Sequence, residues 1–375
     1  MGSKTYFDRN DTKVIKGVAV LLMLLHHLWG FPDRIALEGG FTSRIAVFGE
    51  PIYLYLADFA KICVSMFMFL GGYGICKSWQ SGKLDLTKKL KELYIMYWKI
   101  FLVFVPIGFI FFDNQKQYCA DASVCSKFSQ FSIRVLLTDF LGIGHKYNAE
   151  WWFLFSYIIA TLTFPLIVRF FEKKSVAVNI FWIIVFSLLM TNVFPVIGDL
   201  EIFGFLNKNL LYKTLFCQKS PYITCFWMGI LMAKENLLEK MHDVLKRNKL
   251  FNPFFDVLTF VVITFLINTY SSNILDFLYV PVLVIVFLDL LSYIPLVYKG
   301  LCFVGRNSTN MWLCHSFFCY YFGSIAVWLV KPGNACLSLV MLVVISLVAS
   351  IVVDCFWKFI GMLNALCQYR LKITK

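Results

Sequence analysis

Long runs of apolar residues alternate along this chain with short polar segments. A helix needs roughly 20 mainly apolar residues to cross the hydrocarbon core of a bilayer. Ten runs come close to that length: 14–31, 52–76, 93–112, 151–170, 176–197, 214–233, 252–270, 275–294, 310–330 and 336–357. The segments between them are too short for a separate domain, which takes roughly 50 residues. The pattern predicts an all-α, polytopic transmembrane helical bundle in a single domain, residues 1–375.

One further apolar segment, 133–145, is too short to cross the bilayer. We expect it to form a short interfacial or re-entrant helix. Strands of transmembrane β-barrels alternate between apolar and polar residues, whereas the runs in this chain are continuous. The pattern therefore favours membrane-spanning helices over a barrel.

The composition supports a membrane protein. The residue types Ala, Val, Ile, Leu, Met, Phe, Trp, Tyr and Cys make up 59% of the chain, and charged residues only 15%. Ordinary soluble domains carry about 25% charged residues. This chain has too few polar groups to cover its apolar surface, which excludes a cytosolic enzyme, and disorder is excluded because it requires low hydrophobicity.

The basic residues indicate how the helices are oriented. The chain carries 35 Lys and Arg residues against 22 acidic ones, a net charge of +13. Lys and Arg gather in cytoplasmic loops of membrane proteins. With the N-terminus inside and ten spans, 24 of the 35 basic residues fall on the cytoplasmic side. We therefore expect a multi-pass protein of the cell membrane with both termini cytoplasmic, whose basic charge meets the lipid bilayer and not a nucleic acid.

The twelve cysteines give no sign of a metal site. Most of them lie inside apolar runs, and none forms the paired Cys-x-x-Cys spacing of a zinc site. Cys119 and Cys125 differ because they lie in a polar loop that we place outside the cell. A disulfide between them is possible there. No metal is predicted.

The first apolar run contains the most informative residues. His26 and His27 lie deep within it, and Lys16 stands near its cytoplasmic end. Lys16 and His27 are eleven positions apart, about 1100° of helix rotation, which puts both side chains on one face and about 16 Å apart along the axis. Ionisable residues inside a span are functional candidates by default. The alternative is a structural role, in which both histidines bond to neighbouring helices.

This spacing suits an acyl-transfer reaction. The phosphates of a thioester donor in the cytosol would bind near Lys16, and its flexible arm would extend along the helix toward His27. An imidazole can accept the proton of a hydroxyl that attacks the thioester. His27 is therefore our candidate for a general base.

The stretch Lys16–Leu21, followed by His27, resembles the first span of the acyltransferase-3 family. In these integral-membrane acyltransferases an Arg precedes Gly-(apolar)-Ala-(apolar)-Leu, and a His follows eleven residues after the Arg. His27, and not His26, stands at the position of the family's catalytic histidine. Lys16 stands where Arg is usual, which keeps the charge but loses the planar two-pronged donor.

Three later blocks resemble the same family in the same order. Phe67–Tyr73 is similar to Phe-Phe-x-x-Ser-Gly-Tyr, with departures at Met68 and Gly71, and Lys77 supplies the basic residue that follows. Glu150–Leu154 resembles a Trp-(aromatic)-Leu block that opens a span from the outer side. Gly305–His315 resembles the late Gly-x-x-Ser-x-x-x-(aromatic)-Leu-x-His block. The resemblance covers nearly the whole chain in the number and order of its spans.

The resemblance implies a membrane O-acyltransferase of the polysaccharide or lipid O-acetyltransferase type. It would transfer an acyl group from cytosolic acetyl-CoA, or another acyl-CoA, to a hydroxyl of a cell-surface glycan or lipid-linked sugar. Acyl-CoA would be a substrate, with no permanently bound cofactor. The expected site residues are His27 and Glu150 for catalysis, Lys16, Lys77, Arg306 and His315 for the donor, and His26, Trp151 and Trp152 for the acceptor.

A transporter or flippase of a lipid-linked glycan is the alternative function. Many transporters show matching Gly/Pro-broken spans in two halves, and we see no such pair here. A transporter also has no need of the register between Lys16 and His27. Both observations favour the acyltransferase.

Overall fold

The computed structural model describes most of the chain. The described residues are 6–31, 34, 41–43, 45–47, 49–113, 127–216, 220–250, 252–270 and 272–373, with side chains up to residue 363. Cys119 and Cys125 lie outside them. Contacts divide the chain into two compact units, each made of three stretches. The first unit comprises Met1–His26, Glu50–Lys88 and Trp152–Arg306, and the second His27–Gly49, Lys89–Trp151 and Asn307–Lys375.

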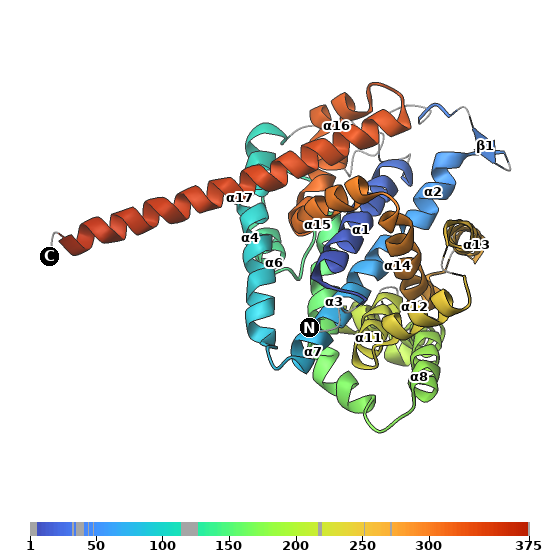
Figure 1. The fold of residues 1–375 in the computed structure, drawn as a ribbon. Helices are drawn as coiled ribbons and strands as arrows, with labels where there is room; N and C mark the ends of the chain where they lie inside the picture. The colour runs from blue at the N-terminus through green and yellow to red at the C-terminus, as the bar shows by residue number, and fades with distance from the viewer. Residues whose placement is uncertain are drawn as a thin grey trace. The chain divides into compact units, whose positions relative to one another are not determined.

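The first unit contains most of the helices (Figure 1). They are α2 (Ile52–Ala60), α3 (Ile62–Gln80), α7 (Trp152–Phe170), α8 (Val176–Leu188), α9 (Phe194–Asp199), α10 (Leu210–Phe216), α11 (Ser220–Lys234), α12 (Leu237–Arg247), α13 (Pro253–Tyr270) and α14 (Asp276–Ser292). Short helices η3 (Leu189–Val193), η4 (Glu201–Phe203), η5 (Leu206–Lys208) and η6 (Asn273–Leu275) join them. The strand β2 (Glu50–Pro51) precedes α2.

The second unit carries the C-terminal helices. It contains the strand β1 (Ala46–Val47), α6 (Ile133–Phe140), η2 (Ala149–Trp151), η7 (Phe317–Tyr321), α16 (Gly323–Val330) and α17 (Ala335–Ile373). Three helices have residues in both units: α1 (Arg9–Trp29), α4 (Leu86–Phe111) and α15 (Pro295–Ser316). Figure 1 shows α17 as one unbroken helix. Its 39 residues extend about 58 Å at 1.5 Å per residue, well beyond a ~30 Å hydrocarbon core.

Polar side chains fix the starts of two helices. The Asp8 carboxylate accepts hydrogen bonds from the backbone N–H groups of Asn10 and Asp11, at 2.6 and 3.0 Å. The Ser132 hydroxyl accepts one from the N–H of Val135. These bonds satisfy N–H groups that have no partner inside the helix. They explain why α1 starts at Arg9 and α6 at Ile133.

The all-α class and the many spans are confirmed, but the count of ten is not. Among the described residues, eight helical segments are long and apolar enough to cross a membrane. The ninth candidate is a bent pair, Pro295–Tyr321 and Gly323–Val330, whose two parts meet at 85°. The described residues therefore contain eight or nine candidate spans, and the membrane sides of the termini remain predictions.

The run 214–233 is the one expected span that does not meet this test. Its described helix is α11, which has 15 residues and extends only about 22 Å. From Tyr222 to Ala233 its side chains are buried. It crosses α3 so closely that a Cβ added to Gly72 would lie 2.0 Å from the Phe226 carbonyl oxygen. Composition misleads here because the interior of a helical bundle is as apolar as its lipid-facing surface.

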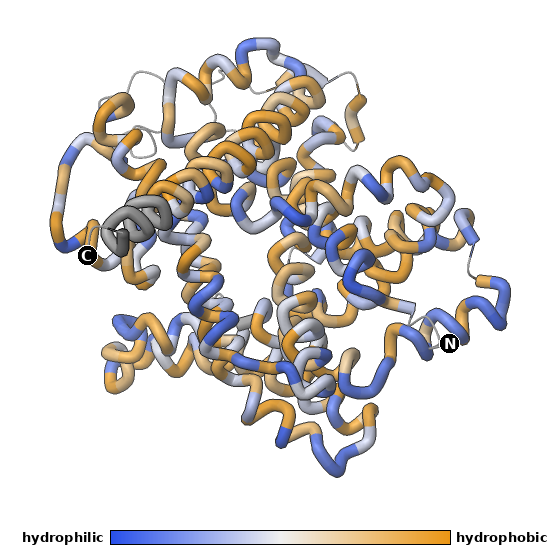
Figure 2. Tube along the Cα trace, turned by 60° about the vertical axis from the view of Figure 1, so that its left-hand side comes forward, coloured by the Kyte–Doolittle hydropathy of each residue, from blue (hydrophilic) through white to orange (hydrophobic). Residues whose placement is uncertain are grey.

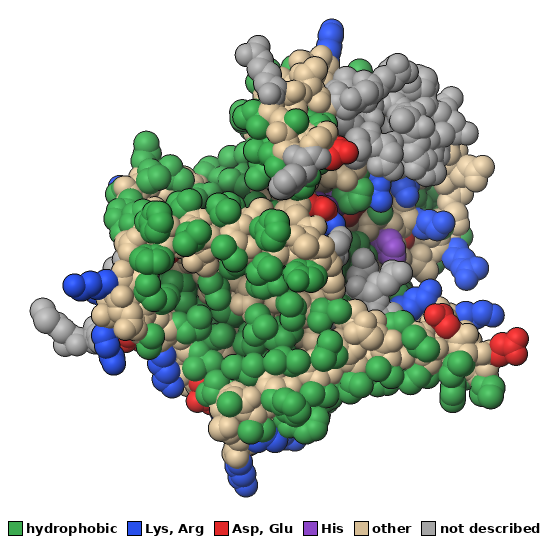
Figure 3. Space-filling view, turned by 90° about the vertical axis from the view of Figure 1, so that its right-hand side faces the viewer, with side chains coloured by type: hydrophobic (Ala, Val, Ile, Leu, Met, Phe, Trp, Pro, Cys, Tyr) green, Lys and Arg blue, Asp and Glu red, His purple; other side chains and the backbone are tan. Residues whose placement is uncertain are grey.

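Other helices expose their apolar side chains. On α13, Phe254 is 71% exposed and Phe265 60%. Figure 2 shows long hydrophobic stretches on most helices, with hydrophilic residues mainly near the ends and in loops. Figure 3 shows a face largely covered by hydrophobic side chains, with Lys and Arg at its margins. Exposed apolar surface of this extent is typical of contact with lipid.

The segment 133–145 forms the short helix expected of it. Its helix, α6, has eight residues and covers about 12 Å, too little to cross a bilayer. A turn with Gly142 at φ +71° follows. The interfacial position of this segment stays a prediction.

Candidate active site

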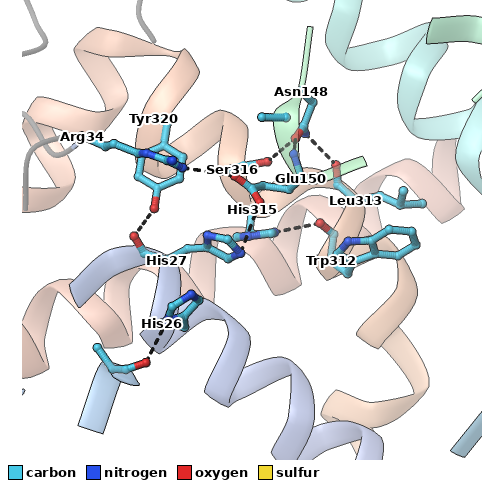
Figure 4. A network of polar contacts seen from close by, with 12 residues as sticks. His26, His27, Arg34, Asn148, Glu150, Trp312, Leu313, His315, Ser316 and Tyr320 are labelled. Atoms are coloured by element: carbon cyan, nitrogen blue, oxygen red, sulfur yellow. Dashed lines mark hydrogen bonds and ion pairs between the residues drawn. The ribbon is translucent and has the colours of Figure 1, made fainter. Parts of the chain in front are cut away.

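His27 lies near the end of α1 and its side chain faces the second unit's interior, where it is 9% exposed. Its Nε2 atom is 3.5 Å from Oε2 of Glu150. Glu150 belongs to the 3₁₀ helix η2 and is 8% exposed. The structure thus brings together the two residues that the sequence proposed for catalysis (Figure 4). A carboxylate beside a ring N–H orients the imidazole and stabilises its protonated form.

Asn148 holds the segment that carries Glu150. Its side-chain oxygen accepts hydrogen bonds from the N–H of Glu150, at 3.0 Å, and from the Ser316 hydroxyl, at 2.9 Å. Its side-chain NH₂ donates to the Leu313 carbonyl at 3.4 Å. The Trp151 indole N–H donates to the same carbonyl at 3.0 Å. Asn148 and Trp151 therefore fix Glu150 against the C-terminal part of α15.

Asp139 supports this segment from the other side. Its carboxylate accepts a hydrogen bond from the N–H of Tyr147 at 2.8 Å, and the Tyr97 hydroxyl donates to its backbone carbonyl. A Cβ on Gly144 would come within 2.3 Å of the carboxylate, so glycine is needed there. Burial raises the pKa of the Asp139 carboxyl, and backbone hydrogen bonds from Tyr147 and Lys146 partly offset the increase. The turn before Glu150 is thus anchored to α6.

Arg34 is a member of the site that the sequence did not indicate. Its guanidinium lies 3.7 Å from Oε1 of Glu150 and 4.2 Å from the centre of the Phe31 ring. The two carboxylate oxygens of Glu150 therefore face a basic residue and an imidazole. Nothing in the loop sequence relates Arg34 to Glu150.

His315 lies beside His27, with 5.0 Å between the ring centres (Figure 4). It is completely buried, and its Nδ1 is 2.7 Å from the Trp312 carbonyl oxygen. Because a carbonyl only accepts hydrogen bonds, Nδ1 carries the proton and Nε2 holds a lone pair. That Nε2 atom has no hydrogen-bond partner within the described residues. The structure therefore offers an unused acceptor next to His27.

The helix changes geometry directly after His315. Residues Phe317–Tyr321 form a π-helix, η7, which ends in the bend before α16. The Tyr320 hydroxyl donates to the backbone carbonyl of His27, and the Tyr321 hydroxyl accepts from the N–H of Ala149 at 3.0 Å. π-helical turns are often found at functional sites. Here the turn directs two tyrosines toward the segments that carry His27 and Glu150.

The other expected site residues belong to the first unit. Lys16 is half-buried, and Arg306 is exposed. The helices that carry them cross closely: a Cβ on Gly17 would lie 2.2 Å from the Leu301 carbonyl oxygen, and one on Gly305 would lie 1.8 Å from that of Lys13. Lys16 and Arg306 each adjoin one of these glycines. Both cations therefore flank the same crossing of α1 and α15.

Three further expected residues have partners within the first unit. The His26 Nδ1 lies 2.8 Å from the carbonyl oxygen of Ala57. Lys77 donates to the side-chain oxygen of Asn236 at 2.5 Å. The Trp152 ring lies 5.6 Å from that of Tyr222. Among the described residues, no group of three or more His, Cys, Asp or Glu side chains is placed to hold a metal ion.

A model of a known protein family matches this chain. The family is described as an acyltransferase domain, and the match covers residues 9–355. Neither the curated proteins nor the solved structures contain a significant match. The matched range includes α1 with His27, η2 with Glu150 and all of α15. The chain therefore belongs to the acyltransferase-3 family, and it is an acyltransferase.

Proposed function

We propose that this enzyme transfers an acyl group from a cytosolic acyl-CoA to a hydroxyl of a cell-surface glycan or lipid-linked sugar, with His27 as the general base. Acetyl-CoA is the first donor to test. The observation that carries the proposal is the buried contact between the His27 imidazole and the Glu150 carboxylate. A buried imidazole paired with a carboxylate is the arrangement that activates hydroxyl nucleophiles in acyl-transfer enzymes.

The contact suggests which atom takes the proton. With Nε2–H of His27 directed at Glu150, Nδ1 is the ring atom that receives the proton of the acceptor hydroxyl. The hydroxyl oxygen attacks the thioester carbonyl, a C–O bond forms, and the C–S bond breaks. The proton then passes from Nδ1 to the departing CoA sulfur. Glu150 stabilises the imidazolium between these two events.

We place His315 near the reacting atoms, as a hydrogen-bond acceptor. Its buried Nε2 acceptor lies next to His27, so it accepts a hydrogen bond from the incoming hydroxyl or from the donor's pantetheine amide. A neutral buried ring suits this role better than it suits phosphate, which prefers a cation. Trp151, which is fully buried, positions Glu150. His26 and Trp152 remain candidates for contact with the acceptor.

Lys16 and Arg306 form the proposed phosphate anchor. Both flank the α1–α15 crossing, and α1 is unbroken between Lys16 and His27, which places these two residues about 16 Å apart along its axis. An extended pantetheine arm covers a distance of that order. Lys77 is a further cation for the same phosphates.

The substitution Lys16→Ala should weaken donor binding and leave the chemistry largely intact. Loss of one charge-assisted hydrogen bond costs about 1.5–3 kcal/mol, so we expect KM for acyl-CoA to rise at least about tenfold with kcat changed less than about threefold. Steady-state kinetics on purified protein measure both constants. Lys16→Arg should keep the wild-type KM. Lys83→Ala, which removes an exposed lysine after α3, serves as the control. If KM for acyl-CoA were unchanged in Lys16→Ala, Lys16 would not bind the donor phosphates.

Acyl-CoA turnover by the purified full-length protein tests the function itself. We expect free CoA to appear only when an acceptor glycan or lipid-linked sugar is present, and the acceptor to gain the mass of one acyl group. Transport of a lipid-linked glycan across a reconstituted bilayer, without acylation of any acceptor, would instead support the transporter hypothesis.

A further inference from the structure

Arg34 holds a positive charge at the edge of the candidate active site. Its side chain is 35% exposed, whereas the side chains of His27 and Glu150 are only 11% and 9% exposed. Its guanidinium lies 3.7 Å from Oε1 of Glu150, and Figure 4 shows it directed at that carboxylate. Of these three side chains, that of Arg34 is therefore the most accessible to a ligand.

Two contacts with Phe31 fix the position of Arg34. The backbone N–H of Arg34 donates a hydrogen bond to the Phe31 carbonyl at 3.0 Å. The guanidinium carbon lies 4.2 Å from the centre of the Phe31 ring, a cation–π contact. The Phe31 ring in turn stacks on that of His27, with 5.8 Å between ring centres and 17° between ring planes. The cation is thus held in place beside the proposed base, so a ligand loses little affinity in ordering it.

The hydrogen-bond donors of Arg34 are not used within the described residues. A guanidinium has five N–H donors. The 3.7 Å contact with Glu150 is an ion pair but is too long for a hydrogen bond, and none of the five donates to another described residue. An arginine that served only to hold Glu150 would be expected to donate to its carboxylate, commonly through two N–H groups. The unused donors therefore indicate a ligand that accepts them.

Proton transfer to His27 increases the need for an anion at this place. While His27 is neutral, the Glu150 carboxylate balances the charge of Arg34. When His27 takes up a proton in the proposed reaction, the one carboxylate faces two cations, at 3.5 Å from His27 and 3.7 Å from Arg34. A negative group of the substrate that faces Arg34 would compensate the guanidinium at that stage.

We propose that Arg34 binds an anionic group of the acceptor, a carboxylate or a phosphate, close to the hydroxyl that becomes acylated. This inference rests on the proposed function, because it assumes that an acceptor hydroxyl reaches His27. The fork of N–H donors of an arginine matches two oxygens of either group. The acceptor is therefore an acidic glycan or a phosphate-bearing sugar, and a glycan without such a group is a poor substrate.

Acyl transfer to matched charged and neutral acceptors tests this proposal. The probe is the glycan and glycolipid fraction of cells that carry the protein, freed of existing esters with mild base. One portion has its carboxylates reduced to alcohols, and another has its phosphates removed. With the purified full-length wild type at saturating acyl-CoA, we expect loss of the group that Arg34 binds to lower kcat/KM for the acceptor at least about tenfold, the effect of one charge-assisted hydrogen bond. The portion that loses activity shows whether the group is a carboxylate or a phosphate.

The substitution Arg34→Gln distinguishes acceptor recognition from a structural role. We expect its kcat/KM to be low for the untreated acceptor and to change less than about threefold when the acceptor's charge is removed, because no coupling between the two groups remains. Arg134→Gln, which removes an exposed arginine of α6 in the same unit, is the matched control. It should keep the wild-type preference for the charged acceptor.

Two results would overturn this inference alone. Equal kcat/KM of the wild type for the untreated acceptor and both treated portions would show that no anionic group is recognised, and this comparison remains measurable even if Arg34→Gln does not fold. A wild-type preference for the charged acceptor in Arg34→Gln would show that another residue binds the anion. If the wild type acylated none of the acceptors, treated or untreated, the proposed function itself would be wrong, and this inference with it.

Discussion

The substitution His27→Ala is expected to lower kcat for acyl transfer by about 10²–10⁴-fold, the usual contribution of a general base. The hydroxyl of the acceptor then has no group to take its proton as it attacks the thioester. Donor binding should change little, because the phosphate anchor lies about 16 Å away along α1. The measurement is acyl transfer to the acceptor at saturating acyl-CoA, together with the Kd for acyl-CoA.

Folding of this variant can be checked independently. The Tyr320 hydroxyl binds the backbone carbonyl of His27, and that contact does not depend on the side chain. We therefore expect His27→Ala to purify as a monodisperse protein with the elution volume of the wild type. His145→Ala, which removes an exposed histidine ahead of Glu150, is the matched control and should keep near wild-type kcat. If His27→Ala retained more than about a tenth of the wild-type kcat, His27 would not be the base.

The substitution Glu150→Gln is expected to lower kcat by roughly 100-fold or more, by analogy with the loss of the carboxylate in a catalytic triad. The amide has nearly the same shape, but it has no charge to stabilise the imidazolium of His27. The Glu150 carboxylate favours the His27 tautomer that carries its proton on Nε2. The NH₂ group of glutamine would disturb this preference. Arg34 loses its charged partner in the same change. KM for acyl-CoA should stay within about threefold.

Comparing kcat of two variants distinguishes a catalytic role of Glu150 from a structural one. Glu150→Asp keeps the charge but shortens the side chain, so its kcat should be higher than that of Glu150→Gln. If Glu150 were only structural, Glu150→Gln would have the higher kcat, because glutamine fits the space of glutamate better than aspartate does. Glu172→Gln, an exposed carboxylate after α7, is the control. If Glu150→Gln kept the wild-type kcat, Glu150 would not be the residue that stabilises the His27 imidazolium.

The sequence determined the class of this protein and the chemistry to look for. Continuous apolar runs predict membrane helices because each backbone polar group must be satisfied inside the segment in lipid. The spacing of Lys16 and His27 is also local, since a helix fixes it without reference to the rest of the chain. Both conclusions depend on residues close in sequence.

Three glycines show which contacts the sequence alone does not reveal. Gly17, Gly72 and Gly305 stand in blocks that resemble the family, but the sequence does not show what each of them contacts. In the structure each of them lies against the backbone of another helix. A side chain at any of these positions would push that helix away. Their role in the first unit is thus close packing, which positions Lys16 and Arg306 at one crossing.

Tertiary structure alone decided which side chains surround His27 and Glu150 in the candidate site. Asn148, Tyr320 and Arg34 join His27 and Glu150 from distant or irregular parts of the chain, and no periodic pattern relates such positions. The sequence assigned His315 to the donor, either at its phosphates or along its tunnel, and the fold buries it beside His27. The span count was uncertain for a related reason. An apolar run looks the same whether it faces lipid or, like α11, other helices, because in a membrane both environments are apolar.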